Sequence, residues 1–481
     1  MQIEYIASDG STKHIRTAWL IGADGKRGVV RKTFLEPIAD IRQVHSDYRY
    51  EGTWIAANLH ILLPTKETHP SFPAWDLGMN PEEVYDLFWP RGWHFCSPPG
   101  KPTATGPFGP HDQRLWRHEF QQDDWDEKTM NAEELLWEHL TPMISRTETA
   151  DGRAFPTTAV YPKDCIEIMR CRPFTFTHNL VNQWFHRKSV LIGDAAHVFP
   201  PFGGQGIASG IRDAHQLALR IAILEDQPHA SDQKVERMLN DWAKERILSI
   251  HDAALLTQIN GAMCNNQSMR PLTKGFQWVQ SFGELLLGSQ PRDPQALAEQ
   301  AGLTGVTGFF LKEFGGGKRL PQIYLNTLFG RRVLSDSIFN ANDSPLRLLV
   351  MVQSNECPKD GLKALQNLLV ESKISPKVLS PDSIVVLSRE PCQPESVGFV
   401  SPTTRRVSPT PLNQLSKKQA RPGYDIAAFQ TRLGSNTRYA ILRPDFFVFS
   451  TATDIHELAL CFERLHDMLN PSHLCINRSV L

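Results

Sequence analysis

The sequence predicts an α/β fold of about three domains, and three observations support that prediction. The chain has 481 residues, which is two to four times the usual domain length of roughly 100–200 residues. A buried strand that begins at Ser189 leads through a glycine-rich loop into a helix at 207–224. A second strand–helix–strand pattern begins near Leu346. Strands that alternate with helices in this way are typical of α/β folds.

Residues 1–32 predict a β-hairpin followed by a glycine-rich turn. Asp9-Gly10 is a strong hairpin signal, and residues suited to strands flank it on both sides. The second arm ends in the apolar run 18–21, which suits a buried strand and leads directly into Gly22-Ala23-Asp24-Gly25. A strand this apolar is expected to need cover on both faces.

Residues 33–184 predict a domain of mixed strands and loops with one clear helix. Three runs have the composition or alternation of strands, namely 54–56, 59–63 and 165–176. Prolines and glycines predict a loop over 97–110, whereas leucines at helical spacing predict a helix from 131 to 144. The aromatic stretch 88–95 is compatible with a ring-binding pocket and equally with core packing.

The rest of the chain predicts a helical region at 231–340 and a further α/β domain at 341–481. The helical period runs over 232–290. The later part predicts six elements in order, which are a strand at 346–352, a helix at 362–372, strands at 383–388, 439–442 and 446–449, and a helix at 455–469. Residues 400–422 are rich in proline, serine and basic residues and predict a solvated loop.

Composition and charge exclude several classes of protein. Hydrophobic residues make up 41% and charged residues 21%, close to a globular average, so neither a disordered nor a fibrous chain is expected. The formal net charge of -1 provides no surface that neutralises phosphates, so no nucleic-acid partner is expected. No apolar run reaches the roughly 18–20 residues that span a bilayer, and the start of the sequence shows no signal peptide.

The eight cysteines predict neither a disulfide framework nor a zinc site. No two of them form a C-x-x-C pair, and the closest two, Cys165 and Cys171, have five residues between them. Sparse cysteines without such spacing favour a reducing, cytoplasmic compartment.

The segment 189–224 carries the most specific chemical pattern in the chain. Its strand ends in Gly193-Asp194, and a loop rich in proline and glycine runs from Pro200 to Gly206 before the helix begins. Glycines let backbone N–H groups approach a ligand closely, and the start of a helix concentrates positive partial charge. The expected ligand is therefore an anion or a group that becomes anionic. Asp194 is placed to accept a hydrogen bond from a ligand hydroxyl, and because nothing neutralises its carboxylate, a phosphate is not expected beside it.

Other residues of this segment have more ordinary explanations. His197 is compatible with a proton relay, although a structural histidine is the commoner case at a buried strand end. Asp213 follows Arg212 and predicts a salt bridge on the helix surface, with a contact to the preceding loop also open. The helix is expected to bury one apolar face, which consists of Ile207, Ile211, Ala214, Ala218 and Ile221.

Gly193–His197 together with Pro200–Gly206 resembles the second flavin signature of the single-component FAD-dependent aromatic hydroxylases, the class of phenol hydroxylase and para-hydroxybenzoate hydroxylase. Gly22–Arg31 is similar to the Asp-Gly signature of the same class, and Met169–Cys171 extends the similarity into the segment between them. Leu442–Asp445 looks like a strand of the thioredoxin-like C-terminal domain in the phenol hydroxylase branch. The resemblance covers most of the chain.

The resemblance implies an α/β fold with a Rossmann-type FAD domain. That domain would consist here of residues 1–32 and 185–230, with an α+β substrate-binding domain inserted at 33–184 and a thioredoxin-like domain at 341–481. The class opens with a G-x-G-x-x-G unit that seats the ADP half of FAD. The sequence contains no such unit, so the resemblance implies an incomplete, N-terminally truncated FAD domain.

The resemblance also implies roles for individual residues. Asp194 would hold the ribityl chain of FAD, and the backbone of 203–207 would face the pyrimidine edge of the flavin, where reduction develops negative charge. Pro200 and Pro201 would wall the substrate side of the ring. The residues assigned in this way to cofactor binding are Asp24, Arg31, Asp194, Gly203, Gly204, Gln205, Gly206 and Ile207.

The function that the resemblance implies is hydroxylation of a phenolic or other electron-rich aromatic compound, such as a secondary-metabolite intermediate, with FAD as cofactor and NAD(P)H and dioxygen as co-substrates. A homodimer is expected from the class. Gly28 departs from the pattern, because the class often has serine there. A second hypothesis stays open, in which the chain is a truncated, catalytically silent relative that acts as a binding or interaction protein, since the edge of the strand at 18–21 would be open to pairing.

Overall fold

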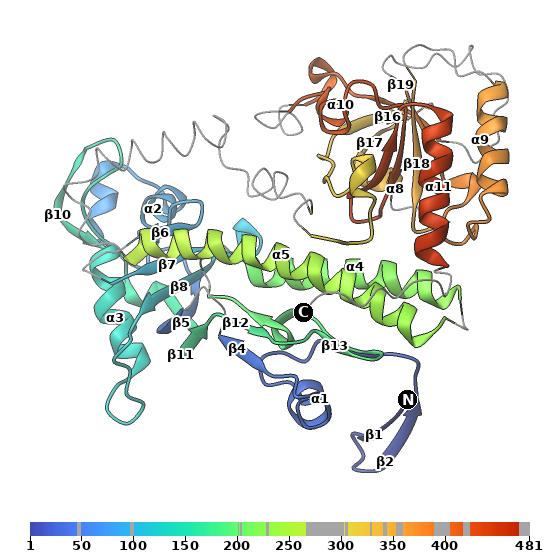
Figure 1. The fold of residues 1–481 in the computed structure, drawn as a ribbon. Helices are drawn as coiled ribbons and strands as arrows, with labels where there is room; N and C mark the ends of the chain where they lie inside the picture. The colour runs from blue at the N-terminus through green and yellow to red at the C-terminus, as the bar shows by residue number, and fades with distance from the viewer. Residues whose placement is uncertain are drawn as a thin grey trace.

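The computed structural model describes most of the chain. The described residues are 1–45, 50–96, 101–200, 202, 204–227, 230–265, 303, 306–327, 330–339, 344–352, 359–388, 405–416 and 424–470. Figure 1 shows two long helices, α4 and α5, running through the centre, with one sheet beside one end of them and another above the opposite end. None of the helices in these ranges combines the length and the apolar character that a membrane span requires.

Two short parallel strands bring the two glycine-rich loops together. β3 (Leu20–Gly22) pairs in parallel with β14 (Ser189–Leu191), so that Gly22 lies opposite Leu191. Because the carboxyl ends of parallel strands meet at the same edge of a sheet, the loops that follow these two strands are neighbours. The hydrogen bond from the Ile192 N–H to the Gly22 carbonyl, at 3.0 Å, continues this pairing.

The predicted hairpin is confirmed, but the strand after it is not covered on both faces. β1 (Gln2–Ile6) and β2 (Thr12–Arg16) pair antiparallel around a turn in which Gly10 has a φ of 79°. β3 lies at the edge of a three-stranded sheet, on the other side of β14 from β13 (Phe185–His186). Ile21 is 42% exposed, so within the described residues the cover expected for this apolar run is incomplete.

The helix after the second loop buries a different face from the predicted one. α4 (Gln205–Glu225) matches the expected helix, yet Ile207 is 81% exposed and Ile211 is 65% exposed. The face that is buried instead consists of Ser209, Asp213, Gln216, Leu217, Leu219, Arg220, Ile223 and Leu224. The physical reason is charge pairing, because Asp213 and Arg220 contact opposite charges in the interior, and the spacing of apolar residues does not register such partners.

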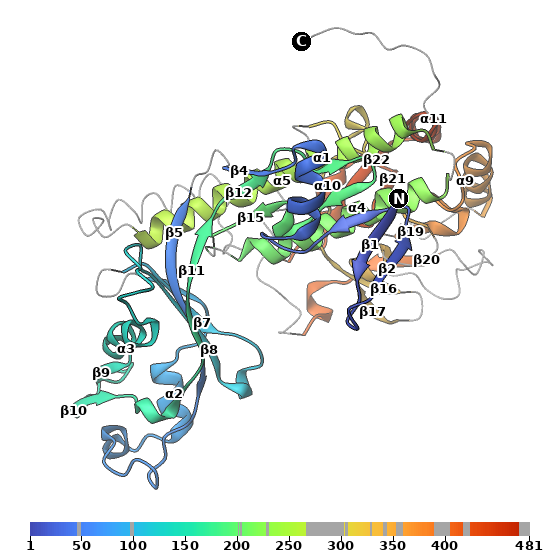
Figure 2. The same cartoon turned by 90° about the horizontal axis from the view of Figure 1, so that it is seen from below.

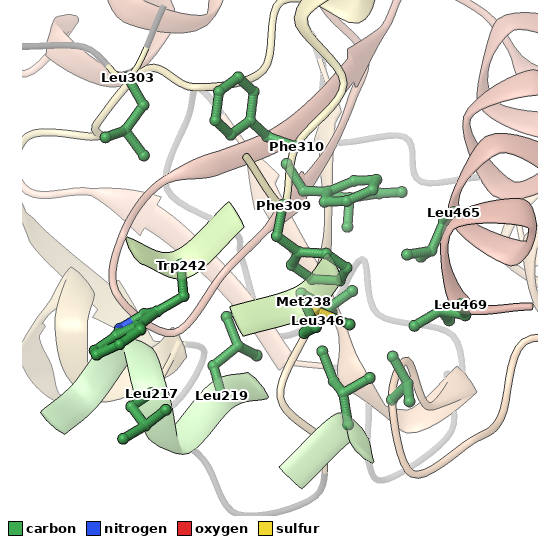
Figure 3. Packing of buried hydrophobic residues seen from close by; sticks show 14 of the residues in the cluster. Leu217, Leu219, Met238, Trp242, Leu303, Phe309, Phe310, Leu346, Leu465 and Leu469 are labelled. Atoms are coloured by element: carbon green, nitrogen blue, oxygen red, sulfur yellow. The ribbon is translucent and has the colours of Figure 1, made fainter. Parts of the chain in front are cut away.

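The core between the two central helices continues into the C-terminal part of the chain. α5 (Asp232–Asn265) packs along α4. Figure 3 shows Leu217 and Trp242 from these helices near Phe309, and Leu465 of the last helix beyond it, in one continuous hydrophobic cluster. The helical period predicted over 232–290 is confirmed as far as residue 265, and the remainder lies outside the described residues.

A five-stranded antiparallel sheet occupies most of the region predicted as a mixed domain. In spatial order its strands are β11 (Ile166–Thr177), β5 (Glu51–Ile61), β8 (Leu115–Gln121), β7 (Thr103–Pro107) and β6 (His94–Cys96). The run predicted at 54–56 and the first three residues of the run predicted at 59–63 belong to the single strand β5, which ends at Ile61. β7 lies inside the stretch 97–110 that composition assigns to a loop, because pairing with β8 and burial of Thr103 and Ala104 outweigh the breakers in the sequence.

Two helices and a hairpin pack at this sheet. α3 (Ala132–Met143) confirms the predicted helix, and the Asn131 side chain caps it by accepting hydrogen bonds from the N–H groups of Glu133 and Glu134. α2 (Pro81–Phe88) and the hairpin of β9 (Ser145–Glu148) and β10 (Ala154–Val160) complete this part. Figure 2 shows β5 and β11 as long neighbouring strands that reach toward the central helices.

A small three-stranded sheet lies at the end of β5 and β11 that is nearer the central helices. It precedes the proline- and glycine-rich loop that leads into α4. Its strands are β15 (His197–Val198), β12 (Asn179–Val181) and β4 (Gln43–His45), and both pairings are antiparallel. α1 (Glu36–Ala39) precedes β4. The sheet thereby connects β11 of the five-stranded sheet to the loops after β3 and β14.

The C-terminal part is a seven-stranded mixed sheet with helices against it (Figure 1). In spatial order its strands are β17 (Arg332–Leu334), β16 (Tyr324–Thr327), β20 (Arg405–Pro409), β19 (Ile384–Ser388), β18 (Arg347–Val352), β21 (Tyr439–Leu442) and β22 (Val448–Ala452). The associated helices are α8 (Ser335–Phe339), α9 (Lys359–Glu371), α10 (Ala428–Leu433) and α11 (Ile455–Leu469).

All six elements predicted from Leu346 onward are present. β20 is a difference, because it lies inside 400–422, where the composition predicts only a loop. Val407 is 2% exposed, and β20 pairs in parallel with β19 and antiparallel with β16. Pairing with neighbours on both sides therefore decides the conformation of this polar segment.

Candidate functional site

The candidate site lies where the loops after β3 and β14 meet the start of α4. Gly193–Ala195 forms one turn of 3-10 helix with Gly193 at a φ of 59°. Gly210 of α4 allows the helix to approach this turn closely, because a Cβ built on Gly210 would lie 3.3 Å from the Gly193 Cα atom. The Asp194 side chain is exposed, while its carbonyl oxygen accepts a hydrogen bond from Gln43 Nε2 at 3.0 Å. The loop is thus held by its backbone and presents the carboxylate outward.

The first residues of α4 have open space around them. Gly204 is the N-terminal flanking residue, in the left-handed conformation (φ 62°, ψ 28°), and as a glycine it makes no side-chain cap to the helix. Cβ atoms built on Gly204 and Gly206 would meet nothing within 4 Å, and the neighbouring Ile207 side chain is 81% exposed. A helix start with its positive partial charge uncapped and open space around its glycines suits an anionic or electron-accepting group.

The remaining predicted residues of this loop divide into described and undescribed ones. Pro200 is buried and Phe202 is 1% exposed, whereas Pro201 and Gly203 lie outside the described residues. The Phe202 ring packs edge-on against Trp54 of β5, with centroids 5.2 Å apart, and against Tyr50 at 5.4 Å. The second loop is therefore anchored to the five-stranded sheet by an aromatic cluster.

A network of buried charged side chains holds the loop after β14 from the interior of the protein. Asp213 Oδ2 accepts hydrogen bonds from the Gly193 N–H at 2.9 Å and from His197 Nε2 at 2.6 Å, and Oδ1 accepts from Arg246 Nε at 2.6 Å. Asp213 is 0% exposed, so the surface salt bridge predicted for it is wrong. Burial alone raises the pKa of Asp213, but the His197 hydrogen bond and the Arg246 charge outweigh burial and hold that pKa below its ordinary value.

This network was only partly visible in the sequence. His197 is fully buried and donates to Asp213 through Nε2, which agrees with the structural role expected for it. Arg246 lies on α5, 33 residues from Asp213, and no spacing rule connects the two. The ionised Asp213 carboxylate, joined to the Gly193 amide, positions the residue before Asp194.

The first loop uses Asp24 and Arg31 to hold its own shape. Asp24 Oδ2 accepts a hydrogen bond from the Val30 N–H at 2.9 Å, at the start of the helical turn Val30–Leu35. Arg31 is 4% exposed, and its Nη2 donates to the Lys26 carbonyl at 2.6 Å. Both side chains contact the loop itself, so any part they take in binding a cofactor is through the position of the loop.

Gly28 has a steric reason in this structure. A Cβ built on Gly28 would lie 2.1 Å from Asp24 Oδ1, which is far inside a van der Waals contact. The serine that the family resemblance implies at this position would therefore displace the Asp24 carboxylate from its hydrogen bond to the Val30 N–H.

Lys26 is a site residue that the sequence interpretation missed. Its Nζ donates to Thr177 Oγ1 at the end of β11, at 2.8 Å. Burial and the Arg27 charge lower the pKa of Lys26, and the carboxylates of Glu51 and Asp194 oppose that shift. A basic residue directly after Asp24-Gly25 was the available signal. The Lys26 side chain places one positive charge between the first loop, the five-stranded sheet and Asp194.

The aromatic stretch predicted as a pocket or as core is mainly core. Phe88 and Trp89 are buried in the hydrophobic cluster of the five-stranded sheet. Trp93 is 43% exposed. The aromatic side chains that lie next to the second loop are instead Trp54 and Phe202, which sequence spacing did not single out.

The residues present fit the flavin end of the cofactor that the sequence patterns imply. The start of α4 carries two glycines, Gly204 and Gly206, whose Cβ positions meet nothing within 4 Å, and it offers positive partial charge there. The exposed Asp194 carboxylate beside this space accepts hydrogen bonds from hydroxyls, as a polyol chain requires. The fit concerns these two features and does not extend to the ADP half.

Comparison with protein families agrees with this fit. Residues 5–233 match the family described as FAD binding domain. The chain is 26% identical over 310 residues to a probable NADH-specific resorcinol 4-hydroxylase of Rhodococcus jostii (strain RHA1), which covers 62% of this chain and 49% of that relative. It is 42% identical over 166 residues to tetracenomycin A2 monooxygenase-dioxygenase of Streptomyces glaucescens, covering 33% and 27% respectively. The chain spans about half the length of the first curated relatives it matches.

Solved structures show the same mixed α/β fold. Aklavinone-11 hydroxylase in a ternary complex with FAD and aklavinone has a TM-score of 0.56 at 16% identity, covering 97% of this chain and 70% of that chain. The rebeccamycin biosynthetic enzyme RebC with reduced flavin has a TM-score of 0.55 at 16% identity, covering 96% and 70%. At these identities the comparison concerns the fold alone.

Proposed function

Because residues 5–233 are an FAD-binding domain and the curated relatives of the chain are aromatic hydroxylases, we propose that this protein is an FAD-dependent monooxygenase that hydroxylates a phenolic or other electron-rich aromatic compound. NAD(P)H and dioxygen are its co-substrates. The observation that carries the proposal is the uncapped start of α4, with open space around Gly204 and Gly206, beside the exposed carboxylate of Asp194.

Each residue of the site has a physical task in this proposal. Asp194 would hold the ribityl hydroxyls of FAD, and the backbone of 203–207 would lie at the pyrimidine end of the flavin, where the helix start favours negative charge. Pro200 and Pro201 wall the substrate side. Asp24 and Arg31 hold the first loop in place and so position the cofactor indirectly.

When bound, FAD supplies hydride acceptance from NAD(P)H and activation of dioxygen for transfer of one oxygen atom to the ring. The protein supplies orientation and exclusion of water. The buried cluster of Trp54 and Phe202 keeps water from one side of the second loop, and the Asp213 network holds that loop rigid against α4.

The same proposal extends to the division of the chain. We assign residues 1–32 and 185–230 to the FAD domain, 33–184 to the substrate-binding domain, 231–340 to a helical region and 341–481 to a thioredoxin-like domain. β16 and β17 lie inside 231–340 but pair into the C-terminal sheet, so the last part of that region belongs with the C-terminal domain and not with the helices. The mixed sheet, in which β19 pairs in parallel with both β18 and β20, and its flanking helices support the last assignment. We further propose a cytoplasmic homodimer, and the described cysteines Cys96, Cys165, Cys171 and Cys461 are all free thiols.

Binding of FAD is the decisive measurement, because the sequence has no G-x-G-x-x-G unit for the ADP half. The purified protein is expected to bind FAD and to oxidise NADH faster when resorcinol, the substrate in the name of one relative, is added. Asp194→Ala should weaken FAD binding about 10-fold or more, as loss of hydrogen bonds to a charged group predicts. Glu463→Ala, at an exposed position on α11, is the control. A colourless protein that takes up no added FAD contradicts the proposal.

A second candidate function is a catalytically silent binding protein. The exposed apolar residues Ile207 and Ile211 on α4 and Ile21 on the edge strand β3 favour it, since exposed apolar surface and unpaired strand edges mark interaction sites. In that case FAD titration shows no binding, while light scattering shows assembly that Ile207→Lys together with Ile211→Lys abolishes. Binding of one FAD per chain excludes this second function.

A further inference from the structure

The topology of the five-stranded sheet brings three side chains of metal-ligating types together. They lie at the end of the sheet that is far from the loops after β3 and β14. β5 and β11 are antiparallel neighbours, with Ile61 opposite Ile166. The loop after β5 carries His69, and the turn before β11, Lys163–Cys165, carries Asp164 and Cys165. Because one strand ends where the other begins, these two segments lie side by side. The hydrogen bond from the Leu62 N–H to the Cys165 carbonyl, at 2.8 Å, joins them.

The three side chains have the spacing of ligands around one ion. His69 Nε2 lies 3.1 Å from both carboxylate oxygens of Asp164 and 3.9 Å from Cys165 Sγ, and the ligand atoms all lie within 4.8 Å of one another. Around tetrahedral zinc, with bonds of about 2.0–2.3 Å, neighbouring ligand atoms are separated by roughly 3.3–3.6 Å. Side-chain movements between well under 1 Å and slightly over 1 Å would bring the three ligand atoms to these separations. A set of nitrogen, oxygen and thiolate ligands favours zinc over magnesium or calcium.

A further set of contacts orients the histidine. His69 Nδ1 lies 2.9 Å from Thr68 Oγ1. Without a metal, Nε2 donates to the Asp164 carboxylate; when an ion replaces that proton, donation from Nδ1 to the Thr68 hydroxyl keeps the Nε2 lone pair directed at the ion. The His69 backbone is held on both sides, because its N–H donates to the Thr65 carbonyl at 2.8 Å and its carbonyl accepts from Trp75 Nε1 at 2.6 Å. The imidazole is thus held in place before any ion binds.

Exposure leaves a route for the ion and for a fourth ligand. The Asp164 side chain is 77% exposed and the His69 side chain 19%, whereas Cys165 is 5% exposed. Solvent reaches the cluster from the Asp164 side, while the sulfur lies inside. In the absence of a metal, His69 and Asp164 form an ordinary ion pair across the same gap, which is the competing explanation for their contact.

We propose that His69, Asp164 and Cys165 bind a zinc ion, with water as the fourth ligand. On binding, the Cys165 thiol releases its proton to solvent and a bond from the thiolate to the metal forms, with no change of oxidation state. β5 spans 11 residues, or about 35 Å at roughly 3.3 Å per residue, between this end and the end next to the flavin loops. The ion therefore acts as a clip between the loop after β5 and the start of β11, and it takes no part in the flavin chemistry.

The test uses cobalt(II) and zinc(II) on the full-length protein. Wild type is expected to bind one cobalt per chain with a sulfur-to-cobalt charge-transfer absorption, and zinc should displace it. Cys165→Ser should abolish that absorption and weaken zinc binding at least ~10-fold, and His69→Gln should weaken it similarly. Two control variants should leave zinc binding unchanged. Cys171→Ser removes the next cysteine along the chain, and His60→Gln removes an adjacent histidine that is paired with Glu167 at 2.7 Å.

Asp164→Asn keeps the test decisive, because an exposed side chain can be changed without loss of folding, as circular dichroism will verify. This variant should bind zinc at least ~10-fold more weakly. The proposal is overturned if wild type binds no stoichiometric cobalt or zinc, or if Asp164→Asn and Cys165→Ser bind the metal as tightly as wild type does. The outcome is independent of FAD, since none of these measurements uses enzymatic activity.

Discussion

The buried carboxylate of Glu245 offers a direct test of how the central helices hold the C-terminal sheet. Its Oε2 lies 2.6 Å from Arg220 Nη2 on α4 and 2.7 Å from Arg443 Nη2, between β21 and β22. Its Oε1 accepts from the Phe309 N–H at 2.7 Å. All three charged side chains are 0% exposed. Glu245→Gln keeps the shape of the side chain and removes the charge that both guanidinium groups share, so that Arg443 retains only its second partner, Asp445.

The magnitude follows from the pKa of this carboxyl group. Burial by itself raises the pKa of Glu245, but the charges of Arg220 and Arg443 outweigh burial and lower it from 4.5 to about 2. The difference between 4.5 and about 2 corresponds to about 3 kcal/mol, at about 1.4 kcal/mol per pH unit. Because the folded-state pKa lies below the unfolded one, this stability is complete above pH 4.5 and is lost as the pH falls toward 2.

We expect Glu245→Gln to lower the free energy of unfolding by about 3 kcal/mol at pH 7, in line with the cost of breaking a buried ion pair. Urea unfolding followed by circular dichroism and tryptophan fluorescence measures it. The control is Glu236→Gln, at an exposed position of the same helix, with an expected change within about 0.5 kcal/mol. Equal midpoints for the two variants would refute the reasoning that the buried charge network joins α4, α5 and the C-terminal sheet.

Three further predictions concern the loops and the sheet. Asp213→Asn removes the charge that holds the Gly193 amide, so it should weaken FAD binding and lower stability by about 3 kcal/mol; unchanged FAD affinity would show that the loop does not need it. Gly28→Ala places a Cβ against Asp24 and should cost about 1–3 kcal/mol in urea unfolding, and a neutral result would show that Asp24 moves freely. Burial, with the His139 charge, lowers the pKa of His118 from 6.5 to about 3. The free energy of unfolding should therefore fall as the pH drops from 6.5 toward 3. For His118→Gln it should fall less steeply over pH 6.5 to 5, and equal slopes for the variant and the wild type would contradict this pKa assignment.

Several elements were predictable because their signals are local. The hairpin around Gly10, the helix capped by Asn131 and the strand–loop–helix segment that contains Asp194 each depend on residues within a short stretch of chain. Turn preference, capping and apolar period act over three or four residues. β7 and β20 were missed for the opposite reason, because neighbouring strands from elsewhere in the chain stabilise segments whose own composition favours a loop.

The sequence by itself determined the two glycine-rich loops, the helix that starts beside Asp194 and the α/β character of the chain. Only the tertiary structure decided which distant groups meet. Asp213 is joined to Arg246, Glu245 to Arg443, and His69 to Cys165, each across more than 30 residues of chain. Such contacts are set by strand register, helix packing and the cost of burying an unpaired charge, and none of these quantities is carried by the order of residues along one segment.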